Sequence, residues 1–322
     1  MSNIFEKRIN YKPFEYPQLK ELWELIEKTF WTVSEINFTA DVNDYLVNLN
    51  STEQSIFRKS LLGIAQIEVG VKTFWGKLYD SLPKPEINNL GSTYAHNESI
   101  HSEAYSELLS VLGLELEFAN IRQIPALYNK YLFIEEKLNT NDIVDKTFFF
   151  TIGIENTSLF SLFSNILSFT RFKGLMKNTS NIIAWSSADE DTHARAGITI
   201  LNIIFNENPK FKEKYTQEYV ENLCKDYIKV EIELLDWIYS EGELGFFTKN
   251  DMINFMKYRL DGAIEKMGYS KIFNISNDDY KPMKWFDEEV YSNTLDDFFS
   301  RRPVDYTKKD KSFDVDDIFD DF

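Results

Sequence analysis

A carboxylate, an imidazole and a phenol stand at helical spacing in one short stretch of the chain, Glu98-Ser-Ile-His101-Ser-Glu-Ala-Tyr105. Residues three and four positions apart are neighbours on one face of a helix, so these side chains are expected to point the same way. The first half of the motif recurs as Glu190-Asp-Thr-His193, and the chain has three histidines in all. Carboxylate and imidazole groups in this arrangement are typical metal ligands.

Two further glutamates interrupt apolar helical stripes. Glu68 stands three or four residues from Ile64 and Val71, and Glu155 stands between Ile152 and apolar residues one turn further on. An unpaired carboxylate costs on the order of several kcal/mol to bury. No Lys or Arg lies one helical turn from Glu155. A cationic partner is therefore needed near these positions.

Four carboxylates and two imidazoles suit a pair of divalent ions, iron or manganese. Ferritin-like di-iron bundles use one Glu from each of two helices and a Glu-x-x-His from each of two others. One such motif alone would more often be a surface pair, and a lone Glu in an apolar stripe would more often reflect a misjudged helix phase. The conjunction on four separate helices favours a di-metal site formed by Glu68, Glu98, His101, Glu155, Glu190 and His193.

The phenol of Tyr105 lies one helical turn after His101, so its ring is expected near the metals. It is either a redox tyrosine or a buried core tyrosine whose hydroxyl is hydrogen-bonded. His96 lies outside the pattern and is read as structural or exposed, and Glu103 and Glu107 are read as solvated or adjacent to the ligands.

Hydrophobic periodicity predicts a chain made almost entirely of helices, with few Gly and Pro residues to break them. Ser51 and Thr52 are expected to cap the helix that carries Glu68, and Gly113 to end the one that carries Glu98. The predicted helical stretches are residues 18–30, 44–49, 51–81, 86–112, 116–138 with a break near Pro125, 142–169, a helix pair within 173–205, 211–241 and 249–267.

The composition narrows the classes of function. The chain has 322 residues and a net charge of −17, which disfavours binding to nucleic-acid polymers or to anionic membranes. No apolar run reaches the ~18 residues of a membrane span. The single Cys224 excludes an intrachain disulfide and a thiolate metal site, and is expected to be a small helix-face residue. A cytoplasmic protein is expected.

These residues resemble the radical-generating small (beta) subunit of class I ribonucleotide reductase, and the resemblance covers nearly the whole chain. It is carried by four motifs: Phe30-Trp31 followed by Ser-Glu-Ile-Asn, Glu98 to Tyr105, Asp189-Glu190-Asp-Thr-His193, and Asp297-Phe-Phe-Ser-Arg-Arg-Pro-Val-Asp-Tyr306 before an acidic, Phe-ended terminus. The resemblance implies an all-α ferritin-like bundle with additional helices, a homodimer, and a reductase whose large subunit reduces ribonucleotides to deoxyribonucleotides.

The resemblance also implies roles for single residues. The six residues above would bind two metal ions that activate O2, and Tyr105 would hold the stable radical. Trp31 and Asp189 would begin the radical path to the large subunit, linked to the metals through His101. Tyr306 would relay the radical, and the last residues through Phe322 would dock on the large subunit.

Two departures from the family pattern are present. Glu68 stands where the first metal ligand is usually Asp, and its longer side chain changes the reach of the ligand. A di-iron centre is expected, but because of Glu68 manganese–iron and dimanganese centres stay open. Leu159 stands where a Phe is common in the aromatic surroundings of the site, for which Phe148, Phe149, Phe150 and Phe163 are candidates.

The chain is predicted to divide into a helical domain, residues 1–295, and a flexible acidic tail, residues 296–322, which is too polar to pack alone. The apolar residues of the tail suit folding on a groove of the large subunit, although an unstructured terminus that only aids solubility is the alternative. Two other functions stay open at this point: a di-metal oxidase acting on a small bound ligand, and an iron-binding or storage protein.

Overall fold

The computed structural model describes residues 3–290, and these residues form helices and connecting loops without a strand. The principal α-helices are α1 (Pro17–Lys28), α2 (Ser51–Gly76), α4 (Pro85–Val111), α6 (Pro125–Leu138), α7 (Ile143–Phe149), α8 (Leu159–Lys173), α9 (Lys177–Glu207), α11 (Gln217–Ile238) and α12 (Lys249–Lys266). Short α-helices are α3 (Leu78–Ser81), α5 (Glu115–Ala119), α10 (Phe211–Lys214) and α13 (Asn277–Tyr280).

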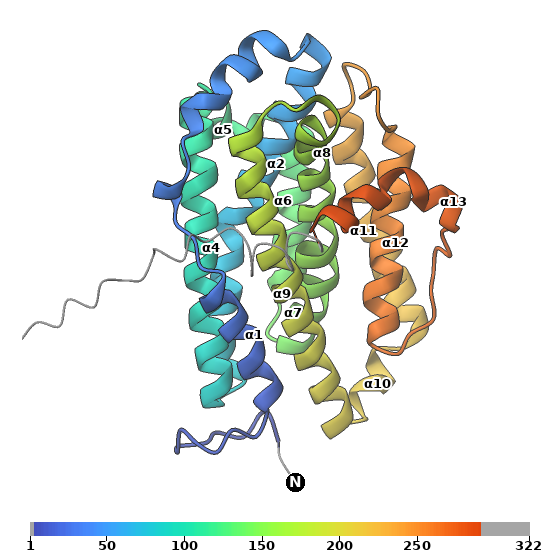
Figure 1. The fold of residues 1–322 in the computed structure, drawn as a ribbon. Coiled ribbons are helices and arrows are strands. Elements are labelled where there is room, and N and C mark those ends of the chain that lie inside the picture. The colour runs from blue at the N-terminus through green and yellow to red at the C-terminus, as the bar shows by residue number, and fades with distance from the viewer. Residues whose placement is uncertain (1–2, 291–322) are drawn as a thin grey trace, which may run out of the picture.

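The long helices lie alongside one another and share one hydrophobic core (Figure 1). Helix α2 packs against α4 and α8, while α9 packs against α4 and α8. Helices α11 and α12 form one flank of the bundle, and α1 lies across α4 and α9. The all-helical prediction is thus confirmed for the described residues. Among those residues, no helix combines the length and the apolar character needed to span a membrane.

Helix α2 begins at Ser51, as predicted, but its cap is Asn50 and not Ser51 or Thr52. Asn50 is the N-cap: its side chain accepts a hydrogen bond from the Glu53 backbone N–H, and the Glu53 carboxylate accepts one from the backbone N–H of Asn50. The helix ends at Gly76 rather than at residue 81. Just before this end the backbone comes very close to α4, because a Cβ on Gly91 would lie 2.6 Å from the carbonyl oxygen of Trp75.

Two other predicted boundaries were wrong. The helix pair expected within residues 173–205 is one continuous helix, α9, because the left-handed Gly174 ends α8 before it begins and no Pro lies within it. The stretch 211–241 is two helices, since Thr216 caps a new start at Gln217.

The stretch predicted as one α-helix over residues 142–169 is continuous but contains a π-helical segment, η5, at Phe150–Ser158. Segments of this kind are rare and often mark functional sites. All nine residues of η5 are buried. The segment joins α7 to α8 and contacts α9 and α12, so it lies on the inner side of the bundle.

The predicted tail, residues 296–322 with Tyr306 and Phe322, lies outside the described residues.

Candidate metal centre

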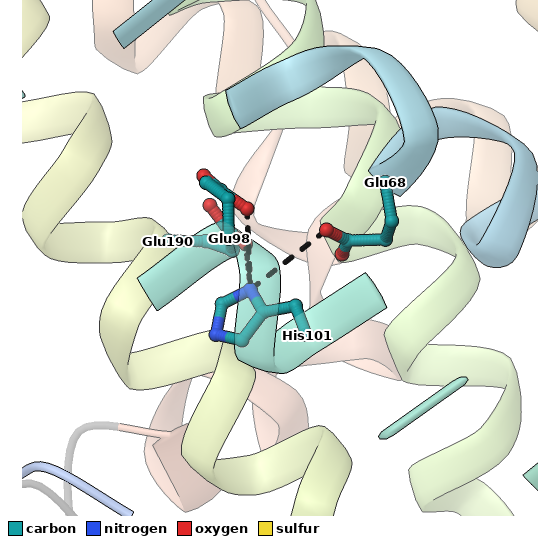
Figure 2. Close-up of side chains that lie close together, drawn as sticks. All are labelled: Glu68, Glu98, His101 and Glu190. Atoms are coloured by element: carbon teal, nitrogen blue, oxygen red, sulfur yellow. Dashed lines mark ion pairs between the residues drawn. The ribbon is translucent and has the colours of Figure 1, made fainter. Parts of the chain in front are cut away.

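Four helical segments deliver the six predicted ligands to one place in the core. Glu68 comes from α2, Glu98 and His101 from α4, Glu155 from η5, and Glu190 and His193 from α9. All six side chains are at most 1% exposed. Figure 2 shows three of the carboxylates, those of Glu68, Glu98 and Glu190, gathered at the ring of His101.

One half of the cluster surrounds His101. Its Nδ1 atom lies 3.0 Å from an oxygen of Glu190, 3.3 Å from one of Glu98 and 3.9 Å from one of Glu68. The ring nitrogen and one oxygen from each carboxylate all lie within 4.8 Å of one another. A single ion among them would have three carboxylate ligands and one imidazole ligand.

The other half surrounds His193 in the same way. Its Nδ1 atom lies 2.9 Å from an oxygen of Glu98, 3.0 Å from one of Glu190 and 3.8 Å from one of Glu155. Glu98 and Glu190 therefore belong to both groups of four ligand atoms. Two ions, one bound in each group, would therefore share the carboxylates of Glu98 and Glu190.

The ligand atoms are suited to metal ions because most of them have no other partner. Both oxygens of Glu68 and of Glu98, one oxygen each of Glu155 and Glu190, and Nδ1 of His101 are buried without a hydrogen bond. Buried polar atoms are rarely left in this state. Oxygen and imidazole donors fit iron or manganese, and the described residues offer no thiolate beside them.

The charges of the cluster shift the pKa values of its members. Burial raises the pKa of Glu68 and of Glu155 well above the usual value for a glutamate. Burial alone would lower the pKa of His101, but the nearby carboxylates of Asp189, Glu190 and Glu98 raise it well above its usual value. The carboxylates around His193 likewise outweigh burial and raise its pKa. Without a metal ion, the cluster therefore binds protons more tightly than isolated glutamate and histidine side chains do.

A hydrogen-bonded chain of buried residues leads away from the cluster. Nε2 of His101, on the side opposite the cluster, lies 3.1 Å from Oδ2 of Asp189, and Nε1 of Trp31 donates to the same oxygen at 2.9 Å. The indole of Trp31 also stacks on the His101 ring at 5.6 Å between centroids. The amide of Asn97 donates to Asp189 as well, at 3.0 Å. Three donors thus fix the orientation of one carboxylate.

Tyr105 is completely buried, and its hydroxyl donates to Oγ of Ser186 at 2.8 Å. Burial, followed by the charge of Glu68, raises the pKa of Tyr105 well above its usual value. The phenol is therefore protonated at all physiological pH values. Ser186 was not foreseen from the sequence, because nothing local marks a serine 81 positions away as the partner.

Two aromatic residues beside the cluster were also missed as site residues. Nε1 of Trp75 donates to Oε1 of Glu155 at 2.8 Å, and the ring of Tyr94 lies 4.2 Å from that of His193. Helical spacing carried a signal for both, since Trp75 stands two turns after Glu68 and Tyr94 one turn before Glu98.

The other residues singled out from the sequence differ in their burial and contacts. His96 is exposed and stacks on Phe30, and Glu103 and Glu107 are exposed. Cys224 is buried.

Leu159 and the four candidate Phe residues are all buried, but the ring contacts of the Phe residues differ. Phe150 stacks on Phe74 and touches Trp75, which donates to Glu155. The other three rings contact different aromatic side chains: Phe148 contacts Tyr215, Phe149 contacts Tyr227, and Phe163 contacts Phe160.

A helical bundle with one Glu from each of two segments and a Glu-x-x-His from each of two others defines the ferritin-like di-metal carboxylate class of proteins. Within that class, residues 8–282 match the family model of the ribonucleotide reductase small chain, and the protein belongs to this family. It is thus the small subunit of a ribonucleotide reductase, as the sequence motifs predicted.

Similar proteins agree with this assignment. A protein of Invertebrate iridescent virus 3, named a probable ribonucleoside-diphosphate reductase small subunit, is 25% identical over 326 residues, which cover 95% of this chain and 86% of that protein. The ribonucleoside-diphosphate reductase small chain of Plasmodium falciparum is 25% identical over 308 residues, covering 94% of this chain and 84% of the relative.

Solved structures confirm the ferritin-like fold. The R2 subunit of ribonucleotide reductase from Clostridium botulinum superposes with a TM-score of 0.78 at 20% identity, covering 88% of this chain and 91% of that one. The dimanganese(II) NrdF of Streptococcus sanguinis gives a TM-score of 0.77 at 21% identity, covering 89% and 100%.

Metal binding is expected to release protons from the apoprotein. The raised pKa values of Glu68, Glu155, His101 and His193 mean that these groups hold protons more tightly than free side chains do, and an ion binds only their deprotonated forms. Addition of Mn2+ at pH 7 in weak buffer should therefore release protons, measured with a pH indicator. Metal affinity should rise with pH for the same reason. Binding of Mn2+ without proton release would contradict this account, and Glu68→Gln should reduce the number released.

Proposed function

We propose that this chain is the radical-generating subunit of a class I ribonucleotide reductase. Its six buried ligands hold two metal ions, Tyr105 carries a tyrosyl radical, and the radical passes through Trp31 and Asp189 to a large catalytic subunit. When bound, the two reduced metal ions supply the means to activate O2 and to oxidise a nearby side chain. The working form is a homodimer that assembles with the large subunit to convert ribonucleoside diphosphates to deoxyribonucleotides.

One observation carries this proposal: His101 belongs to the cluster through Nδ1 and to the Trp31–Asp189 chain through Nε2. A histidine that ligates a metal commonly hydrogen-bonds a carboxylate through its other nitrogen, which fixes the ring. Here that carboxylate also binds an indole, so a redox-active ring is connected to the cluster by two hydrogen bonds. An iron store or an oxidase of small ligands has no use for this connection.

Tyr105 suits the radical role because of where its proton and its ring lie. The phenol is protonated and hydrogen-bonded to Ser186, so its oxidation must remove an electron and a proton together. Its complete burial keeps water and reductants from the ring. These conditions favour a long-lived neutral radical.

The identity of the metals is the open element of the proposal. Iron is the expected pair, and the likeness of the fold to a dimanganese(II) protein keeps manganese as an alternative. The longer side chain of Glu68, in place of Asp, changes the reach of the ligand at the His101 side of the cluster. The tail, with Tyr306 as a relay and the residues to Phe322 as the docking segment, completes the proposed path.

Tyr105→Phe is expected to abolish the tyrosyl radical and leave metal binding intact, because only the hydroxyl is lost and it ligates nothing. Electron paramagnetic resonance after aerobic loading with iron, manganese or both measures the radical, and metal analysis measures the content. Tyr239→Phe is the matched control, since Tyr239 is also buried and hydrogen-bonded but lies at the end of α11. Reductase activity that survives Tyr105→Phe would sink the radical role and favour a metal-based oxidant.

Trp31→Phe is expected to leave the metals and the Tyr105 radical in place but to lower reductase activity with the large subunit by about 100-fold or more, because the link to Asp189 is lost. Formation of deoxyribonucleotide is the measurement, with Trp237→Phe on α11 as the control. Full activity in Trp31→Phe would contradict the proposed path and make a ligand oxidase or an iron store the better explanation.

A further inference from the structure

The segment that delivers Glu155 to the cluster is unusual in its backbone. Glu155 lies within η5, the π-helical stretch Phe150–Ser158 between two α-helices. A π-helical turn is wider than an α-turn and is rarely stable for more than a single turn. Yet this one extends over nine residues, all of them buried. Surrounding side chains must therefore stabilise it.

Side chains from two helices hydrogen-bond the backbone of η5 on either side of Glu155. The hydroxyl of Tyr227, on α11, donates to the carbonyl oxygen of Gly153 at 2.5 Å. Nε of Arg259, on α12, donates to the carbonyl oxygen of Asn156 at 2.5 Å. The Asn156 side chain returns a hydrogen bond to the carbonyl oxygen of Arg259 at 2.9 Å. The two carbonyl groups that accept these hydrogen bonds therefore flank Glu155: Gly153 lies two residues before it and Asn156 one residue after it.

Both donors are themselves held in place. The Tyr227 ring packs so closely on η5 that a Cβ on Gly153 would lie 3.2 Å from it. The guanidinium of Arg259 lies over the ring of Phe160 at 3.6 Å and pairs with Asp287 at 3.0 Å. Arg259 is only 8% exposed. Both side chains are thus packed or paired in the core while they donate to the backbone of η5.

The end of the segment is fixed by a buried ion pair. Nζ of Lys130, on α6, hydrogen-bonds the hydroxyl of Ser158 and pairs with Glu231 of α11 at 3.2 Å. Ser158 is the last π-helical residue before α8 begins. A lysine that is 1% exposed is costly to bury, and here it stands where the backbone returns to α-helical geometry.

We propose that Tyr227 and Arg259 are positioning residues, which hold η5 in its π-helical form and thereby direct the Glu155 carboxylate toward Glu190 and His193. The other reading is that they are ordinary core hydrogen bonds with no bearing on the cluster. The proposal rests on the proposed function only in taking the cluster as the metal site.

The chain offers a matched pair of variants to separate the two readings. Tyr227→Phe removes the hydroxyl that binds Gly153. Tyr239→Phe removes a similarly buried hydroxyl from the end of the same helix, which donates at 2.5 Å to Asn165 of α8. Each variant removes one buried hydroxyl and creates no new group. Only the first loses a contact with η5.

Two readouts on the purified full-length protein test the proposal. Hydrogen–deuterium exchange of the peptide 150–158 in the apoprotein reports the π-helical segment directly, and Mn2+ titration followed by electron paramagnetic resonance of the free ion reports metal affinity. Tyr227→Phe should speed exchange in the peptide and weaken the second Mn2+ by about 10-fold or more, the usual effect of losing a partner of a metal ligand. Tyr239→Phe should lower the melting temperature by a similar amount without either effect. Arg259→Gln should act like Tyr227→Phe, and Arg259→Lys should restore part of the affinity.

Equal exchange and equal Mn2+ affinity in Tyr227→Phe and Tyr239→Phe would overturn the proposal, because a purely structural hydrogen bond predicts that result. The two proposals fail in different ways. A wild-type protein that binds no Mn2+ or Fe2+ would refute the proposed metal centre, while the exchange of the peptide 150–158 would still decide whether Tyr227 and Arg259 hold η5.

Discussion

Four glutamate side chains meet in the core with no Lys or Arg ion-paired to any of them among the described residues, and much of the structure depends on this concentration of negative charge. Carboxylates are costly to remove from water unless they are paired. Two histidines supply the nearest compensation, and they do so as neutral ligands or as imidazolium ions. Two metal ions would balance the charge and satisfy the unpaired oxygen atoms together.

The fold meets this constraint with four helical segments that approach closely enough for their side chains to share two ions. Glycine permits that approach where α2 meets α4, at Gly91, and where η5 meets α9, since a Cβ on Gly197 would lie 2.0 Å from the Thr151 side chain. The same packing brings Asp189 and Trp31 behind His101. The cluster and its connection to Trp31 are thus products of one set of helix contacts.

Local spacing predicted the parts of the site that lie on single helices. Glu98 and His101, and Glu190 and His193, could be paired from the sequence because residues three apart share a helix face. Glu68 and Glu155 could be recognised as candidate ligands because a carboxylate within an apolar stripe is costly to bury without a cationic partner. Hydrogen bonds between distant segments, such as Trp75 with Glu155 and Tyr105 with Ser186, have no local signal and require the structure. The π-helical form of η5 was missed for the same reason, since the donors that stabilise it come from α11 and α12.

The central claim is that these six side chains hold two ions that share Glu98 and Glu190. Anomalous diffraction from crystals loaded with Mn2+ or Fe2+ tests it most directly. The account predicts two peaks, about 3.5–4 Å apart as in other two-metal sites, one beside Glu68 and His101 and the other beside Glu155 and His193. A single peak, or peaks away from the cluster, would contradict it.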